Sequence, residues 1–200
     1  MNSSMETDAR FVALKAVVNA LVSPPEDEWL AFANLFQPHA LKTGEYFIRA
    51  GERSESLGFV NAGLLRFFYQ TPAGTEFNKS FAQENGFIAS YSAYLTSTES
   101  RFSIQALEDS YLLVADLETV ADKFNGHEHW QALGRILAEQ LYIKKEQREA
   151  EFLLDDAETR YRTFQAQFPG LEDRLPQYHV ASYLGITPVA LSRIRKQLKS

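Results

Sequence analysis

The last sixteen residues, GITPVALSRIRKQLKS (185–200), have the side-chain types that contact nucleic acid. From residue 174 to the end there is no Asp or Glu, but there are five cations: Arg174, Arg193, Arg195, Lys196 and Lys199. The chain has a formal net charge of −6, and these cations contribute +5 to it, so the first 173 residues have a net charge of −11. Guanidinium groups pair with guanine, and ammonium and hydroxyl groups bind phosphate. This basic end is therefore where we expect an acidic protein to contact DNA.

The spacing of residues in the window 177–196 predicts a helix-turn-helix. Apolar side chains recur at Val180, Leu184, Ile186, Leu191 and Ile194. Two short helices that cross steeply need small residues where they touch, and Ala181 and Gly185 supply them. Gly185 also permits a turn with positive φ. Thr187 is expected to cap the second helix, and Pro188 suits its first position.

The second helix of this unit has two faces. Leu191, Ile194 and Leu198 are expected to point inward, and Val189, Ser192, Arg193 and Lys196 outward. An ordinary helical hairpin with a solvated basic face is the alternative, but the small-residue spacing and the local charge reversal favour a DNA reader. The predicted DNA-contacting residues are Thr187, Pro188, Val189, Ser192, Arg193, Arg195, Lys196 and Lys199.

The remaining reactive side chains do not form a catalytic or metal-binding pattern. The four histidines are His39, His127, His129 and His179, and none lies between residues 40 and 126 to supply the strand-borne ligands of a cupin-type metal site. Without cysteine, the chain has no disulfide framework and no thiolate metal site. No G-x-S-x-G, P-loop or GxGxxG motif occurs. We therefore predict no enzyme activity, no metal and no cofactor.

Bulk composition sets the remaining limits. Two hundred residues at 45% hydrophobic suffice for one large domain or two modest ones. No apolar run approaches the roughly 18 residues of a membrane span. The start, MNSSMETDAR, lacks the basic-then-apolar layout of a signal peptide. The expectation is a cytoplasmic protein without membrane contact.

The elements that must position the basic end follow from the hydrophobic pattern. Residues 10–22 predict a helix, and a second helix is expected after Ser23-Pro24-Pro25, with Ser23 as its N-cap and Pro24 at its first position. From about 41 to 116, glycines bound short aromatic and β-branched runs, which indicates an antiparallel β-roll or sandwich. Residues 71–74 (TPAG) predict a hairpin connection within it.

A long helical segment follows the β section. The stretch HWQALGRILAEQLYIKKEQREAEFLL (129–154) is far longer than an average helix. It either packs back on its own roll or, as we favour, forms a helix-to-helix dimer interface centred on Leu133, Leu137 and Leu141. Asp155 and Asp156 are expected to break it and cap the next helix, which ends before Pro169-Gly170.

A glycine-rich roll, a long helix and a C-terminal helix-turn-helix, in this order, resemble the Crp/Fnr family of bacterial transcription regulators. The resemblance covers about residues 25–198 and rests on three stretches: LKTGEYFIRAGERSESLGFVNAGLLRFFY, ENGFIASYSAYLTSTESRFSIQALED and LPQYHVASYLGITPVALSRIRKQL. It implies an α+β protein: N-terminal helices with a jelly-roll-like, cyclic-nucleotide-binding-like antiparallel effector roll (1–126), a long dimerisation helix (127–154) and an all-α helix-turn-helix domain (155–200). It further implies a homodimer that binds a pseudo-palindromic operator in double-stranded DNA.

The effector region departs from the family pattern. Members that bind cyclic nucleotides have a glycine–glutamate pair for the ribose, and later an Arg-Ser/Thr-Ala segment for the phosphate. This chain has Ala89-Ser90 and Ser100-Arg101-Phe102-Ser103 in their places. Binding of cyclic AMP is therefore not expected. A different small-molecule effector, or none, is left open, with candidate pocket residues Ala89, Ser90, Tyr91, Tyr94, Arg101 and Phe102.

The DNA-binding end also departs from the family. Many members place a glutamate near the start of the recognition helix, where this chain has Val189, whereas Arg193 matches the family's base-contacting arginine. The usual β-hairpin wing is missing from the sequence after Leu198, so fewer phosphate contacts are expected. A ligand-binding or adaptor module of the same fold without DNA binding is the alternative.

Overall fold

The computed structural model describes residues 9–198, in two compact units. Unit 1 comprises the chain up to Phe67 together with Phe81–Glu139, and unit 2 comprises Phe68–Ser80 together with the chain from Gln140 onward. Within residues 9–198, no helix combines the length and the hydropathy that crossing a bilayer requires.

Two short helices open unit 1. After a 3₁₀ turn (Ala9–Phe11), α1 is Val12–Leu21 and α2 is Glu26–Ala33. The predicted cap at Ser23 is wrong: Pro25 is the N-cap of α2, and the helix begins at Glu26. Ser23 instead adopts a φ of +43°, and its hydroxyl donates to the carbonyl of Asn19 at the end of α1, 2.9 Å away. The serine therefore ends one helix rather than starting the next.

The β section consists of two four-stranded sheets, in the orders β1-β8-β3-β6 and β2-β7-β4-β5. The strands are β1 Gln37–Leu41, β2 Tyr46–Ile48, β3 Ser56–Ala62, β4 Leu65–Gln70, β5 Glu76–Ala82, β6 Phe87–Ile88, β7 Ser103–Ala106 and β8 Ser110–Asp116. The predicted roll is confirmed, but β1 lies before its expected start. This strand contains Pro38 and pairs antiparallel with β8 at the sheet edge, where proline is tolerated. A short helix, α3 (Tyr91–Leu95), follows β6.

The core of unit 1 joins the N-terminal helices to the start of the long helix. α4 is Leu117–Gly126 and α5 is Glu128–Leu154. Trp130 of α5 is fully buried and stacks on Phe32 of α2, with centroids 4.4 Å apart. Its indole N–H donates to Glu28, whose carboxylate also pairs with Lys123, each at 2.7 Å. The first turns of α5 therefore belong to the core of this unit.

Unit 2 begins with the tip of the β4–β5 hairpin. The backbone N–H of Thr71 donates to the carbonyl of Thr75 at 2.9 Å, and Gly74 has a φ of +84°. This bond and the positive φ of Gly74 close the connection predicted at residues 71–74.

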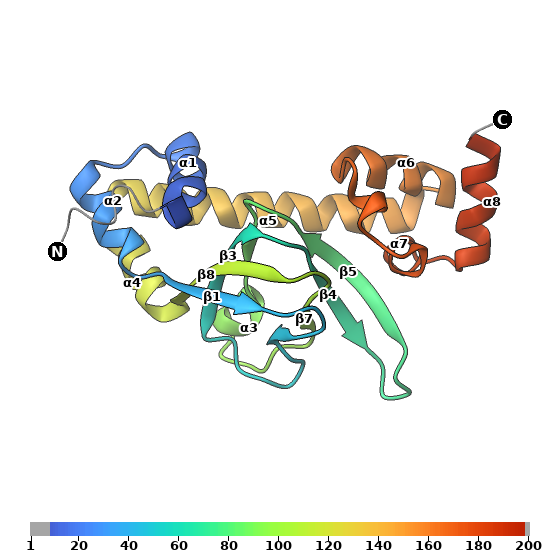
Figure 1. Ribbon diagram of the computed structural model, residues 1–200, viewed down its shortest axis with the longest axis horizontal. Coiled ribbons are helices and arrows are strands. Elements are labelled where there is room, and N and C mark those ends of the chain that lie inside the picture. The colour runs from blue at the N-terminus through green and yellow to red at the C-terminus, as the bar shows by residue number, and fades with distance from the viewer. Residues whose placement is uncertain (1–8, 199–200) are drawn as a thin grey trace. The chain divides into compact units, whose positions relative to one another are not determined.

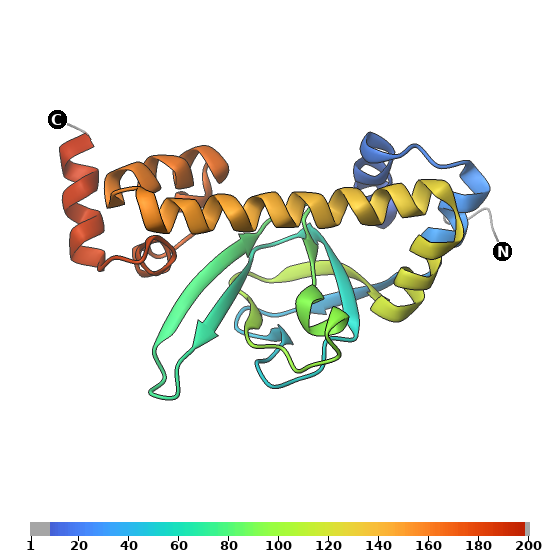
Figure 2. The ribbon, with the colours of Figure 1, turned by 180° about the vertical axis from the view of Figure 1, so that it is seen from behind.

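The rest of unit 2 is helical, as Figures 1 and 2 show. α5, which they show as one continuous helix, leads to α6 (Ala157–Gln167), a 3₁₀ turn η3 (Leu171–Asp173), α7 (Gln177–Leu184) and α8 (Pro188–Leu198). The side chain of Asp156 caps α6 by accepting from the N–H of Thr159 at 2.8 Å. Gly170 follows with a φ of +74°. The predicted long helix, the break after it and the C-terminal helical order are confirmed.

Candidate nucleic-acid interface

The turn between α7 and α8 accepts only glycine at its first position. Gly185 has a φ of +70°, where a side chain is strained. A Cβ on it would also lie 2.7 Å from Cε1 of Phe152 at the end of α5, much closer than carbon atoms approach without a clash. The hydroxyl of Thr187 then accepts from the N–H of Ala190 at 3.2 Å and caps α8, with Pro188 as its first residue. The structure thus has the turn chemistry that the sequence predicted.

α8 separates its side chains into a buried and an exposed face. Leu191 is completely buried and Ile194 nearly so, while Val189 is 62% exposed. Ser192, Arg193 and Lys196 are exposed with Val189, and Thr187 and Pro188 are exposed at the helix start. The guanidinium of Arg193 has no hydrogen bond or ion pair with any described residue, so it is available to a ligand. Lys199 lies outside the described residues.

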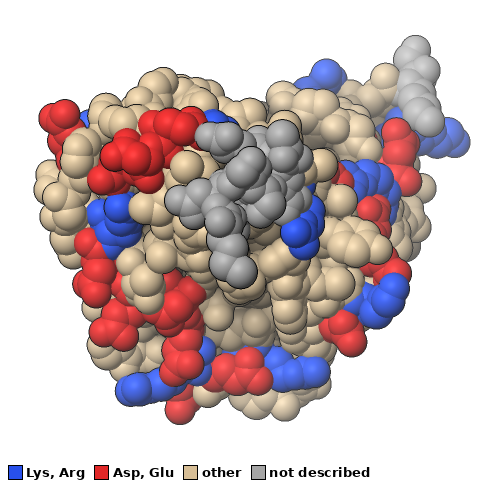
Figure 3. Space-filling view, turned by 60° about the vertical axis from the view of Figure 1, so that its left-hand side comes forward, with Lys and Arg blue, Asp and Glu red and all other residues tan. Residues whose placement is uncertain are grey.

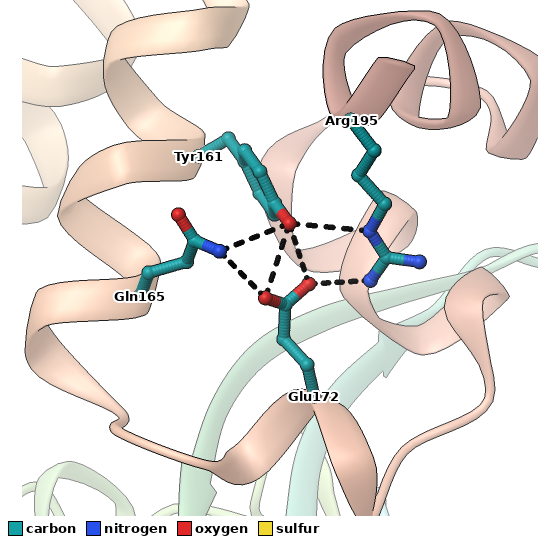
Figure 4. A network of polar contacts seen from close by, with 4 residues as sticks. All are labelled: Tyr161, Gln165, Glu172 and Arg195. Atoms are coloured by element: carbon teal, nitrogen blue, oxygen red, sulfur yellow. Dashed lines mark hydrogen bonds and ion pairs between the residues drawn. The ribbon is translucent and has the colours of Figure 1, made fainter. Parts of the chain in front are cut away.

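Arg195, also predicted to bind DNA, faces the opposite way. Its guanidinium pairs with the carboxylate of Glu172 in η3, and its Nε donates to the hydroxyl of Tyr161 at 3.2 Å (Figure 4). Gln165 completes the network by donating to Glu172 at 2.8 Å and to Tyr161 at 3.1 Å. The Arg195 and Glu172 side chains are only 28% and 22% exposed. Arg195 therefore fastens α8 to α6 and η3 instead of projecting from its exposed face.

The electrostatics of this network favour the ion pair. Burial raises the pKa of Glu172, but hydrogen bonds from Gln165, Arg195 and Tyr161 outweigh it and hold the pKa below its usual value. Burial lowers the pKa of Arg195, and its bonds to Glu172 and Tyr161 more than compensate. Both groups therefore remain charged at neutral pH. The sequence contained one signal of this role, since Arg195 follows Leu191 by four residues and so shares its buried side.

The hairpin tip holds α7 through buried polar contacts that sequence reasoning missed. Asn78 of β5 donates from its side-chain nitrogen to the carbonyl of His179 at 3.0 Å, and the same nitrogen lies 3.0 Å from Nδ1 of that histidine. Its backbone N–H donates to the hydroxyl of Ser182 at 2.9 Å. Asn78 and His179 are 5% and 4% exposed. About one hundred residues separate these partners in sequence, so no local sequence pattern predicts that they are in contact.

The predicted dimer residues on α5 differ in their burial. Leu133 is fully buried in the core of unit 1, and Leu137 packs against the same cluster. A side chain without exposed surface has nothing to offer a second subunit, so Leu133 does not fit the interface predicted for it. Leu141 is 37% exposed. The more exposed apolar side chains of the second half of the helix are Tyr142, Ile143, Phe152, Leu153 and Leu154.

The candidate effector residues of unit 1 differ in their burial and in the core cluster that they contact. Ala89 and Tyr94 pack against the cluster that contains Trp130, while Phe102 belongs to the second core cluster of the roll. Tyr91 stacks on Tyr94, with centroids 6.3 Å apart, and Arg101 is exposed. The candidate set therefore contains members of both core clusters and one exposed cation.

Buried serines occupy the place where the family pattern has phosphate-binding and ribose-binding groups. The hydroxyl of Ser100 lies 2.8 Å from that of Ser90 and 2.7 Å from the carbonyl oxygen of Phe102. The backbone N–H of Ser90 donates to the hydroxyl of Ser54 at 3.2 Å. All three serines are 6% exposed or less. These serine hydroxyls and the backbone groups beside them therefore bond to one another.

Comparisons with known proteins agree with this architecture. Residues 38–127 match the protein family described as the cyclic nucleotide-binding domain. A CooA variant from Carboxydothermus hydrogenoformans superposes with a TM-score of 0.68 at 17% identity, covering 84% of this chain and 78% of CooA. A Crp/Fnr-family transcriptional regulator from Eubacterium rectale gives 0.67 at 13% identity, with 88% and 84% covered. The chain has the Crp/Fnr fold.

The resemblance predicted from the sequence is thereby confirmed at the level of the fold. Another Crp/Fnr-like structure is CLP of Xanthomonas campestris, described as a c-di-GMP-responsive global regulator, with a TM-score of 0.67 at 13% identity over 88% of this chain and 92% of CLP. These neighbours are regulators rather than enzymes. A comparison of the sequence with curated proteins finds no match.

Proposed function

We propose that the protein is a dimeric, sequence-specific DNA-binding transcription regulator of the Crp/Fnr type, without enzymatic activity, that works in the bacterial cytoplasm. The observation that carries the proposal is the exposed face of α8. Its apolar side is buried, its arginine at position 195 is held internally, and its other face presents Ser192, Arg193 and Lys196 outward. A helix with this division enters the major groove with its polar side.

Within this function the exposed cations of α8 have different roles. Arg193 reads a base, because an unpaired guanidinium can form two parallel bonds to guanine. Lys196, one turn further on, contacts phosphate, which carries no sequence information. Two copies of α8 related by a dimer axis fit successive major grooves about 34 Å apart, so the operator is a pseudo-palindrome.

The dimer forms through the exposed side of α5. Leu141, Tyr142 and Leu153 supply the apolar contact surface, and all three lie in the half of the helix that belongs to unit 2. Leu133 and Leu137 support the same helix from within unit 1. An exposed run of large apolar side chains on one long helix is typical of a subunit interface.

The roll does not respond to cyclic AMP. Support comes from the mutually bonded Ser90 and Ser100, and from Phe102, which is 4% exposed and part of the core. A nucleotide phosphate would need a cationic partner at this point, and the neighbouring Arg101 is exposed.

The experiment that tests the function is selection from randomised DNA duplexes with the wild type, Arg193→Ala, Lys196→Ala and Arg162→Ala. Arg162 is a matched control because it is an exposed arginine of unit 2 on α6, paired with Glu158. Arg193→Ala is expected to cost about 1–3 kcal/mol on the selected site and to relax preference at one base pair per half-site. Lys196→Ala is expected to weaken all sequences alike and to flatten the salt dependence of binding by about one unit for each phosphate that the protein no longer neutralises.

The control is expected to behave as the wild type. If Arg193→Ala keeps the full sequence preference, α8 is not the reader. If the wild type selects no motif at all, the alternative of a ligand-binding or adaptor module of the same fold replaces the proposal.

A further inference from the structure

Two arginines from outside the helix-turn-helix hold the end of α7. The last carbonyls of a helix have no partner within it. Here the carbonyl of Tyr183 accepts from Arg148 of α5, and the carbonyl of Leu184 accepts from Nε of Arg160 of α6 at 3.2 Å. These two carbonyls immediately precede Gly185, the turn that leads to the reading helix. The turn is therefore bonded to both preceding helices.

One phenyl ring contacts both arginines. The guanidinium carbon of Arg148 lies 4.2 Å from the ring centroid of Phe152, and that of Arg160 lies 5.3 Å from it. The edge of the same ring occupies the space where a Cβ of residue 185 would be. A cation over an aromatic face is attracted by its electron density, so ring and guanidinium groups hold each other in place. We call Arg148, Phe152 and Arg160 the turn clamp.

Further contacts hold the two arginines of the turn clamp in place. Arg148 pairs with Glu151 at 2.9 Å, and the two side chains are 17% and 13% exposed. Its guanidinium also lies 3.8 Å from the ring centroid of Tyr183, which is 2% exposed and packs on Phe164. Arg160 donates through Nη1 to the carbonyl of Asp155, in the break between α5 and α6, at 2.7 Å. Arg160 therefore bridges the break between α5 and α6 and also binds the end of α7.

We infer that Arg148, Phe152 and Arg160 are positioning residues that fix the reading helix to the end of α5, so that the distance between the two DNA half-sites follows from the geometry of the α5 dimer. The inference rests on the proposed function. With the turn clamp closed, α8 cannot change its angle to α5 without breaking bonds at Tyr183 and Leu184. A dimer of such subunits accepts one half-site spacing.

The test is DNA selection with two half-sites separated by spacers of random length. The variants are Arg160→Met and the double change Arg148→Met/Glu151→Gln, which avoids leaving a buried carboxylate alone. Arg135→Met is the matched control, because Arg135 is also on α5 and pairs with Glu139 at the surface. The preference of the variants for one spacing is expected to fall about tenfold, the factor that corresponds to losing one hydrogen bond to a charged group. The bases selected within each half-site are expected to stay the same.

Hydrogen exchange without DNA separates this inference from the proposed function. The turn variants are expected to exchange faster than the control at the amides around Gly185, while α1 and α2 are unchanged. A wild type that selects no DNA motif refutes the proposed function, and the exchange result still decides whether the turn clamp exists. Unchanged spacing preference, or unchanged exchange at the turn, overturns the inference. If a Met variant does not fold, Arg160→Lys keeps the charge and serves in its place, with the same expected direction.

Discussion

Replacing Glu172 by glutamine tests whether the network of Figure 4 holds α8 in place. The substitution keeps the shape of the side chain and removes its charge, so Arg195 loses its ionic partner but keeps its bond to Tyr161. Hydrogen bonds to charged groups contribute about 1.5–3 kcal/mol when buried, whereas exposed ion pairs contribute about 0–1 kcal/mol. Because these two side chains are 28% and 22% exposed, we expect a loss of about 1–2 kcal/mol in the free energy of unfolding.

The pH dependence has a definite sign. The pKa of Glu172 is held below its usual value in the folded protein, where hydrogen bonds to the carboxylate outweigh burial. Such a group stabilises the fold at pH values above its unfolded pKa, and it loses this contribution as the pH falls through its folded pKa. The difference between wild type and Glu172→Gln is therefore expected to be complete at neutral pH and to shrink in acid, below about pH 4.

The assay is urea unfolding followed by circular dichroism over a pH series, with hydrogen exchange of α8 to localise the effect. Glu158→Gln is the control, since Glu158 forms a surface pair with Arg162 in which the side chains are 41% and 61% exposed. We expect the control to lose no more than about 0.5 kcal/mol. Equal losses in both variants, or a Glu172 effect that persists undiminished in acid, would refute the reasoning.

Three further predictions concern other parts of the chain. If the chain forms the proposed dimer, Tyr142→Asp, on a side chain that is 67% exposed, is expected to convert it to monomer in sedimentation without loss of helix content. Gln140→Asp, on another side of α5, is expected to leave the proposed dimer intact. Burial and the nearby Lys145 and Lys144 lower the pKa of Lys79 to about 8, so stability is expected to rise with pH from about 8 to 10. Lys79→Met is expected to reduce this rise in unfolding experiments but not to abolish it, because burial also lowers the pKa of Lys144. Titration calorimetry with cyclic AMP is expected to show no binding, and a micromolar dissociation constant would contradict the assignment of Ser90 and Ser100 to an internal network.

The parts of the fold that could be predicted are those encoded locally. Gly185, Thr187 and Pro188 each act within the turn that contains them, and Asp156 caps the helix that begins beside it. Their positions could be predicted because turn and cap chemistry depends on residues three or four apart. The glycine-bounded strands were predictable for the same reason.

The faces of two helices could not be assigned as reliably. Arg195 was grouped with the DNA-binding cations by its charge, although Glu172 and Tyr161 bind it from other elements. Leu133 was assigned to a subunit interface because its stripe is long, but the stripe first serves the chain's own core around Trp130. In both cases the partner lies on another element, and periodicity alone does not say which neighbour covers a face. The buried contact of Asn78 with His179 is the extreme case.

The charge of the two units limits where DNA can bind in the proposed function. Unit 1 has 9 Lys and Arg against 17 Asp and Glu, and unit 2 has 11 against 9. Acidic side chains form patches on the face shown in Figure 3, with basic ones between them, and DNA is repelled from such a surface.

With Arg195 bound internally, few cations remain on the exposed side of α8 within the described residues, so under the proposed function each copy of α8 is expected to bind DNA weakly by itself. Two weak heads give a tight complex only when binding of the first places the second at its half-site, which requires that their separation be fixed in advance. In the proposed dimer, the bonds of Arg148 and Arg160 to the carbonyls before Gly185 would fix α8 within each subunit, and the α5 interface would fix the distance between subunits. In the proposed function, the specificity of DNA binding therefore depends on Arg148 and Arg160, which hold the turn before the reading helix, as well as on Arg193.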